Sequence, residues 1–157
     1  MSRSRIVALA VVAGCKFADV TLEQQRAYPW SNPPGDLATL DGSHASYSPD
    51  SGANCIGDGM PGCALTDLVF VGSKPTGDGR WGQSDLAGNL YEWALDWYSA
   101  TYVKPCMDCA NLTPASTRVL RGGSFLNVAT DVRTDHRGNF SPTYRGSNFG
   151  VRCARTP

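Results

Sequence analysis

Hydrophobic residues in this chain form short clusters that are separated by long polar stretches. Apolar runs of about four to eight residues, bounded by turn residues, are typical of buried strands. Such runs predict strands at 5–12, 68–71 and 149–154, and Val119-Leu120 leads another strand into a pair of glycines. The segment between the second and third of these strands carries four large anchors, Tyr91, Trp93, Trp97 and Tyr98. The pattern predicts short strands, little helix and long ordered loops.

The polar stretch from residue 31 to residue 68 predicts one long loop. It is dominated by Gly, Asp, Ser, Asn and Pro and keeps neither a strand period nor a helix period. A loop of this length in a compact domain is uncommon unless it is functional, ion-stabilised or cross-linked. Cys55 and Cys63 can cross-link it. Four of its carboxylates could contribute to a second ion site, although solvated loop carboxylates are commoner: Asp36, Asp41, Asp50 and Asp58.

Length and charge narrow the classes of function. A chain of 157 residues suits one domain. Its 14 basic and 14 acidic residues balance, and the basic residues form no runs, so there is no electrostatic footprint for nucleic acid or an anionic membrane. Partners must therefore be recognised by shape and local contacts.

The N-terminal segment 1–15 has two readings. Met1–Arg5 and the apolar run Ile6–Ala13 have the basic and hydrophobic regions of a secretory signal, and the run is too short to span a bilayer. Val12-Ala-Gly-Cys15 resembles a bacterial lipobox, whose cysteine is lipidated. Residues 5–12 also read as an N-terminal strand that pairs with the C-terminal one. The first reading predicts an exported protein of the cell envelope or extracellular space, with residues 16–157 as its domain.

Six cysteines in a chain of this size favour an oxidising compartment, which agrees with export. Cys55 and Cys63 close a short Gly/Asp loop, and Cys106 and Cys109 follow Pro105 in a predicted turn, so each pair is a candidate local disulfide. A zinc site made from these thiols would be poorly spaced. Two disulfides are therefore expected within the domain.

Five ordered segments carry a family resemblance: Tyr28-Pro-Trp30, Val71–Pro75, Gly88–Trp93, Arg121–Phe125 and Phe149–Cys153. Together they resemble the C-terminal half of the sulfatase-modifying-factor family, whose founding members are formylglycine-generating enzymes. The resemblance implies an α+β fold of the irregular, C-type-lectin-like kind. Some family members bridge the terminal cysteine to one shortly before the Y-P-W segment, which implies a Cys15–Cys153 disulfide. That bridge competes with lipidation of Cys15.

The resemblance implies the family's scaffold without its chemistry. Formylglycine-generating enzymes bind copper through two cysteines between the G-G-S segment and the final strand. In this chain those positions fall on Ala129 and Thr134. A methyl or hydroxyl group cannot replace a thiolate as nucleophile or soft metal ligand. We therefore expect no formylglycine-generating activity.

A calcium site is expected where the Gly88–Trp93 segment begins. Asp85 and Glu92 offer carboxylates, and Gly88 and Leu90 offer backbone carbonyls, which are the hard oxygens that calcium prefers. The resemblance implies that these four residues are calcium ligands. The alternative is that Glu92 only hydrogen-bonds nearby backbone.

The C-terminal third is rich in arginine. Arg121 and Arg152 read as structural, because a guanidinium that bridges several oxygens fixes irregular backbone. The loop from Leu126 to Ser147 differs, because it mixes aromatic, basic and amide side chains as recognition surfaces do. Without a paired carboxylate, His136 alone is weak evidence for catalysis. The candidate ligand-binding residues are Asn127, Asp131, Arg133, Asp135, His136, Arg137, Asn139, Phe140, Tyr144 and Arg145.

The sequence thus predicts an exported, calcium-stabilised, non-catalytic domain that binds a protein, a peptide or a small molecule. One alternative is an oxidoreductase of the formylglycine-generating type or another oxidative enzyme on this scaffold. An iron enzyme would need a histidine-rich metal site, and His44 and His136 are the only histidines. A second alternative is a variable ligand-binding protein of a diversity-generating retroelement, since such proteins use this fold.

Overall fold

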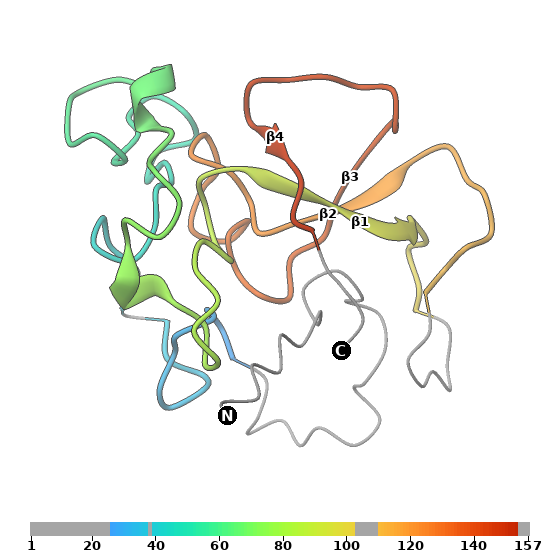
Figure 1. Ribbon diagram of the computed structural model, residues 1–157, viewed down its shortest axis with the longest axis horizontal. Helices are drawn as coiled ribbons and strands as arrows, with labels where there is room; N and C mark the ends of the chain where they lie inside the picture. The colour runs from blue at the N-terminus through green and yellow to red at the C-terminus, as the bar shows by residue number, and fades with distance from the viewer. Residues whose placement is uncertain (1–25, 38, 103–109, 154–157) are drawn as a thin grey trace.

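The computed structural model describes residues 26–37, 39–102 and 110–153, and its regular elements are few and short. Four strands, β1 (Tyr91–Trp97), β2 (Arg118–Arg121), β3 (Gly138–Phe140) and β4 (Phe149–Gly150), form one sheet in the order β3-β2-β1-β4. Among the described residues, the 3-10 turns η3 (Leu65–Asp67) and η4 (Pro75–Gly77) precede them. The sheet occupies the centre of the molecule, while the loops between residues 39 and 90 cover one side (Figure 1). This is the irregular α+β architecture that the sequence predicts.

The sheet brings three of the sequence motifs together. β1 pairs with β2 in antiparallel fashion, with Glu92 opposite Arg121, and with β4 in parallel fashion, with Tyr91 opposite Phe149. The β1–β2 register is irregular between Trp93 and Trp97, which is the position of a β-bulge. The Gly88–Trp93, Arg121–Phe125 and Phe149–Cys153 segments are therefore neighbours in space.

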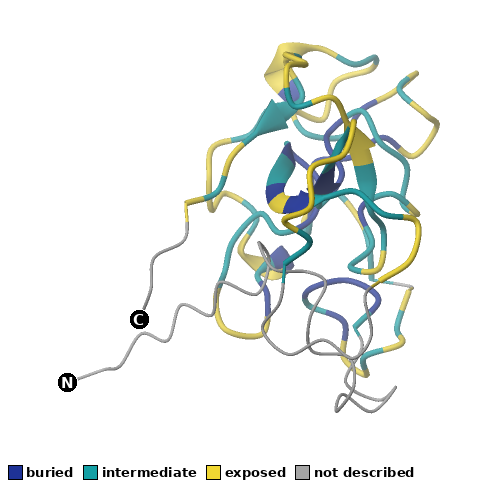
Figure 2. Ribbon diagram, turned by 90° about the vertical axis from the view of Figure 1, so that its right-hand side faces the viewer, coloured by how far each residue is buried: buried dark blue, intermediate teal, exposed yellow. Residues whose placement is uncertain are grey.

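The core is small and lies where the sheet meets the long loop. Leu120 of β2 is fully buried, and a cluster of Tyr28, Tyr47, Ala87 and Val132 joins the N-terminal segment to the C-terminal half. Buried segments gather in the interior and exposed segments on the outer loops (Figure 2). Gly88 is required at its position, because its φ is 73° and an added Cβ would lie 2.2 Å from the carbonyl oxygen of Ser46.

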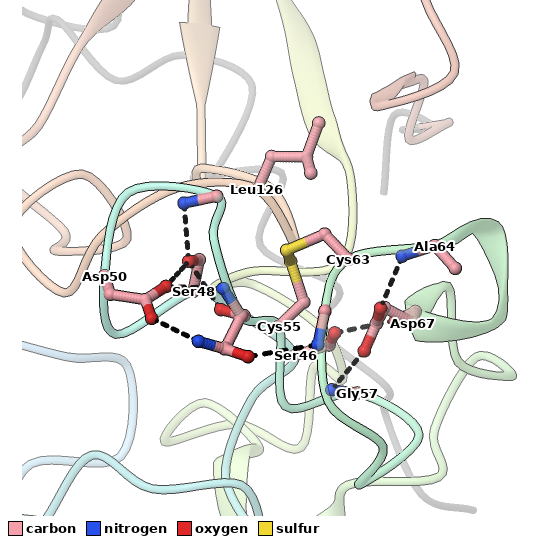
Figure 3. Close-up of a disulfide and its surroundings, with 12 residues drawn as sticks. Ser46, Ser48, Asp50, Cys55, Gly57, Cys63, Ala64, Asp67 and Leu126 are labelled. Atoms are coloured by element: carbon pink, nitrogen blue, oxygen red, sulfur yellow. Dashed lines mark hydrogen bonds between the residues drawn. A yellow bond between two sulfur atoms is a disulfide. The ribbon is translucent and has the colours of Figure 1, made fainter.

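The loop from residue 31 to residue 68 is ordered by side chains instead of by regular structure. The predicted Cys55–Cys63 disulfide is present, and the carboxylate of Asp67 accepts hydrogen bonds from the backbone of Gly57 and Ala64, both at 2.9 Å (Figure 3). The hydroxyl of Ser48 donates to the carbonyl of Asn54 and accepts from the backbone of Gly52. Side chains thus satisfy the polar backbone that strands would otherwise pair.

Two strand predictions need correction. Residues 68–71 form no strand, because the side chain of Asn89 pairs with both backbone groups of Val69, at 3.1 and 3.2 Å. Phe70 and Val71 are 92% and 85% exposed. The closing strand expected at 149–154 ends at Gly150, and Val151 is 76% exposed. Phe70, Val71 and Val151 therefore face solvent and lack the buried partner that a strand face needs.

Some predictions fall outside the described residues. These are the signal, lipobox or strand at 1–15 and the Cys106–Cys109 pair. Within the part of the chain that the structure describes, no helix is long and apolar enough to cross a bilayer.

Candidate functional site

An open pocket of about 370 Å³ lies beside the segment that follows the core residue Val132. A volume of this size is within the usual range for small-molecule sites. Three of the side chains that line the pocket are basic and one is acidic. The lining residues are Tyr98, Thr130, Arg133, Asp135, His136 and Arg137.

Arg121 fixes the backbone on which most of the pocket is built. Its guanidinium, at the end of β2, donates to the backbone carbonyls of Thr134 and His136. Burial lowers the pKa of this guanidinium, which nevertheless stays protonated at neutral pH because an arginine begins far above it. The structural role predicted for Arg121 is therefore confirmed, and the role is to position residues 134–136.

His136 has a carboxylate and a phenol on its two ring nitrogens, which the sequence alone did not indicate. Nδ1 lies 3.6 Å from Oδ1 of Asp131, and Nε2 lies 3.5 Å from the hydroxyl of Tyr91. Burial, with a further contribution from Asp131, raises the pKa of Tyr91 to about 12. The phenol therefore keeps its proton at neutral pH, and the arrangement orients the imidazole at the edge of the pocket.

The two pocket arginines differ in their partners. Arg133 donates from Nε and Nη2 to the two carboxylate oxygens of Asp135, both at 3.1 Å. Arg137 instead lies over aromatic rings, with its guanidinium carbon 4.0 Å from the ring centre of Tyr102 and 5.3 Å from that of Tyr98. Such cation–π contacts hold a guanidinium without neutralising it.

The other predicted ligand-binding residues lie apart from the pocket lining. The side chain of Asn127 is used within the loop, where it accepts from Ser124 and donates to Asp131 at 2.9 Å. Asn139 and Phe140 are exposed on β3, and Arg145 donates to the carbonyls of Pro142 and Tyr144. An aromatic cluster built on β1, β3 and β4 consists of Tyr91, Trp93, Phe140, Tyr144 and Phe149.

Ala129 and Thr134, the positions on which the family's cysteines were expected to fall, both contact the segment around Ala27. Ala129 packs against the core cluster, and its carbonyl accepts a 3.3 Å hydrogen bond from Tyr28. The hydroxyl of Thr134 donates to the carbonyl of Arg26, and its backbone N–H donates to Ala27 at 2.9 Å. Both side chains are therefore built into the packing between the N-terminal segment and the pocket loop.

At the expected calcium site, an arginine joins the acidic groups. Arg152 contacts both carboxylate oxygens of Glu92, at 2.7 and 2.9 Å, and donates to the carbonyls of Ser84 and Asp85 at 2.9 and 3.0 Å. The carboxylate of Asp85 accepts from the backbone of Gly72 at 2.7 Å. Among the described residues, no group of three or more His, Cys, Asp or Glu side chains could hold a metal ion. Any cation here would rely on backbone carbonyls.

Sequence reasoning missed three residues of the pocket region. The sequence marks Tyr98 only as a large aromatic anchor and does not distinguish Thr130 or Tyr102. Tyr98 and Tyr102 follow β1, so the aromatic-rich end of that strand was the available signal. Cys153 carries a free, exposed thiol, and Cys15 lies outside the described residues, so their bridge stays a prediction.

Comparison with known proteins identifies the relatives of this chain. Residues 8–157 match the family model described as sulfatase-modifying factor enzyme 1-like domain. The chain is 37% identical over 86 residues to the formylglycine-generating enzyme of Streptomyces coelicolor. The aligned region covers 52% of this chain and 26% of that relative. The chain thus spans about a quarter of the length of this curated relative.

Two solved structures resemble the fold. Treponema denticola variable protein 1 aligns with a TM-score of 0.54 and 29% identity, over 69% of this chain and 34% of that one. PvdO from Pseudomonas aeruginosa aligns with a TM-score of 0.56 and 25% identity, over 74% of this chain and 41% of that one. The fold is the C-type-lectin-like α+β fold of these proteins.

Proposed function

We propose that the chain, which belongs to the sulfatase-modifying factor enzyme 1-like domain family, is a non-catalytic, calcium-stabilised binding domain. Its recognition surface is the loop from Leu126 to Ser147, which carries most of the pocket lining. The partner is a protein, a peptide or a small molecule that enters this pocket.

The surroundings of Thr134 carry this proposal. Its hydroxyl is engaged with the carbonyl of Arg26, and the methyl group of Ala129 packs against the core. Oxidation of a substrate cysteine through copper would need two thiolates at these positions. Beside them lies an open polar pocket lined by two arginines and a histidine, whose basic side chains could contact a ligand.

The test is incubation with copper, oxygen and a peptide that carries a sulfatase motif, followed by mass spectrometry. We expect no formylglycine above the level of an Arg137→Ala, His136→Ala double variant. Aldehyde product that depends on the wild-type pocket would overturn the non-catalytic assignment and favour the oxidoreductase alternative.

Calcium is proposed as a structural ion held by Asp85, Gly88, Leu90 and Glu92. The donor set supports it, because carboxylate and carbonyl oxygens in a loop of irregular backbone suit calcium. Asp85, Gly88 and Asn89 all have positive φ values, between 56° and 73°, as sharp ligand loops require. Arg152 uses one acceptor position on each oxygen of Glu92, and a carboxylate oxygen has a second. When bound, the ion would neutralise clustered oxygens and brace the start of β1.

Export is proposed together with this function, and with it lipidation of Cys15 as an anchor. The Cys55–Cys63 disulfide supports export, because such bonds persist in oxidising compartments. Mass determination of the mature protein from its native cell would detect a cleaved or diacylated N-terminus. An unprocessed Met1 with reduced cysteines would contradict export.

A second candidate function is that of a variable ligand-binding protein of a diversity-generating retroelement. The likeness to the structure named Treponema denticola variable protein 1 favours it, as does the exposure of Asn139, Phe140 and Tyr144. The surrounding DNA tests it. A neighbouring reverse transcriptase and a template repeat matching the codons of the recognition surface would support this candidate, and their absence would overturn it.

A further inference from the structure

The pocket contains one cation with a different environment from the others. Arg133 is paired with Asp135, and His136 faces Asp131. Arg137 lines the same pocket, and among the described residues it has no carboxylate within ion-pairing distance. Its hydrogen bond to the carbonyl of Ala100 is long, at 3.4 Å from Nη2.

The way Arg137 is held leaves most of its N–H donors without an oxygen acceptor. Its contacts with Tyr102 and Tyr98 are made to the rings, with the guanidinium carbon 4.0 and 5.3 Å from the ring centres. A guanidinium has five N–H donors in its plane, and the hydrogen bond to Ala100 uses one of them. The planar donors match the two oxygens of a carboxylate or phosphate group.

The backbone beneath Arg137 is already fixed in place. Arg121 binds the carbonyls of Thr134 and His136, so the segment that precedes Arg137 is braced by a second, partly buried cation. A preformed donor group loses less conformational entropy on binding than a mobile surface arginine does. The positive charge of Arg121 also lies behind the pocket and favours an anion in front of it.

We propose that this pocket binds the oxyanion of a small ligand, a carboxylate or a phosphate group, through the edge of the Arg137 guanidinium. The inference rests on the proposed function, in which this loop is the recognition surface, and it specifies the chemical class of the ligand. Tyr98 supplies an apolar wall beside the anion, and Thr130 supplies a hydroxyl at the rim.

The test is an NMR titration of the isotope-labelled chain with sodium acetate and with sodium phosphate, at constant ionic strength set by sodium chloride. We expect saturable shifts of the Arg137 side-chain Nε signal and of the amides of residues 133–137 with at least one of the two anions. Saturation by acetate assigns a carboxylate ligand, and preferential saturation by phosphate assigns a phosphate ligand. Saturation by neither overturns the inference.

Variants give the second arm. Arg137→Gln should weaken the apparent affinity about tenfold or more, because a hydrogen bond to a charged group contributes roughly this much. Arg137→Lys keeps the charge but loses the planar fork, so it should bind more weakly than wild type even if the glutamine variant fails to fold. Arg118→Gln is the matched control, since Arg118 also lies over a ring, that of Trp97 at 4.3 Å, but outside the pocket lining.

The inference is wrong if Arg137→Lys binds as wild type does, or if Arg118→Gln weakens binding equally. A pocket without affinity for either anion could still hold a neutral ligand, so that result would leave the proposed function intact. Formylglycine production would overturn the proposed function and leave anion binding intact.

Discussion

Arg152 binds both carboxylate oxygens of Glu92, at 2.7 and 2.9 Å, and so links the residues after β4 to β1 across the parallel pair of strands. The same guanidinium donates to the carbonyls of Ser84 and Asp85. One side chain thus joins three separate stretches of chain.

Arg152→Met should lower the free energy of unfolding by about 1–3 kcal/mol, since it leaves a partly buried carboxylate without its partner. Urea denaturation measures this. Arg80→Met is the control, because Arg80 is exposed, lies over the ring of Trp81 and forms no ion pair with any carboxylate of the described residues. Equal losses in the two variants would mean that the pairing with Glu92 does not stabilise the fold.

Calcium should raise the melting temperature, and a chelator should lower it, because an ion that binds only the folded state stabilises it by linkage. At a free calcium concentration a hundred times its Kd, the gain would be about 2.7 kcal/mol. Glu92→Gln should abolish the calcium-dependent shift, whereas Asp135→Asn should retain it, since Asp135 pairs with Arg133 in the pocket. The shift is the relevant quantity, because the Glu92 variant also weakens the pairing with Arg152. If neither calcium nor the chelator changes the melting temperature, the protein has no calcium site here.

Replacing Cys55 and Cys63 by serine should destabilise the protein by about 2–4 kcal/mol, because the disulfide restricts the unfolded chain and fastens a loop with little regular structure. Thermal unfolding with and without a reducing agent provides the measurement. If reduction shifts the wild type no more than the double serine variant, the bond contributes nothing.

Non-reducing peptide mapping of the same sample tests Cys106–Cys109 and decides between a Cys15–Cys153 peptide and a diacylated Cys15.

The long loop should weaken in acid. Hydrogen bonds from Ser43 and then from His44 hold the pKa of Asp41 well below its ordinary value of 3.8. A lowered folded-state pKa contributes stability above that ordinary value, and the contribution is lost as the pH falls from 3.8 through the folded-state value. Urea denaturation at pH 5, 3 and 2 should therefore show the advantage of wild type over Asp41→Asn shrinking as acid is added. A constant difference between the two would contradict the assignment.

The sequence by itself determined the family, the absence of long helices from the described residues, the long loop and the Cys55–Cys63 disulfide. These features are local or nearly so. Two cysteines eight residues apart in a Gly/Asp loop can meet whatever the rest of the chain does. Likewise, Gly88 and Gly122 have positive φ values and close backbone neighbours, so a residue with a side chain would not fit there. A glycine in the motif therefore already indicates this local backbone conformation.

The tertiary structure alone decided which groups meet across long separations. Residues 68–71 have the apolar composition of a strand, but Asn89, twenty residues later, pairs with Val69 and leaves Phe70 exposed. Tyr98 joined the pocket because β1 ends beside the loop that carries Arg137. His136 acquired Asp131 and Tyr91 as neighbours in the same way.

The physical reason is that such contacts depend on the relative placement of segments. Composition and periodicity report whether a side chain suits a strand, a turn or a core, but they carry no information about which distant segment it faces. In a fold held by loops and single side chains such as Arg121 and Arg152, that placement is set by a few long-range hydrogen bonds. The loop from Leu126 to Ser147 could therefore be proposed from the sequence as a recognition surface, whereas its division into a cationic pocket and an aromatic cluster required the folded chain.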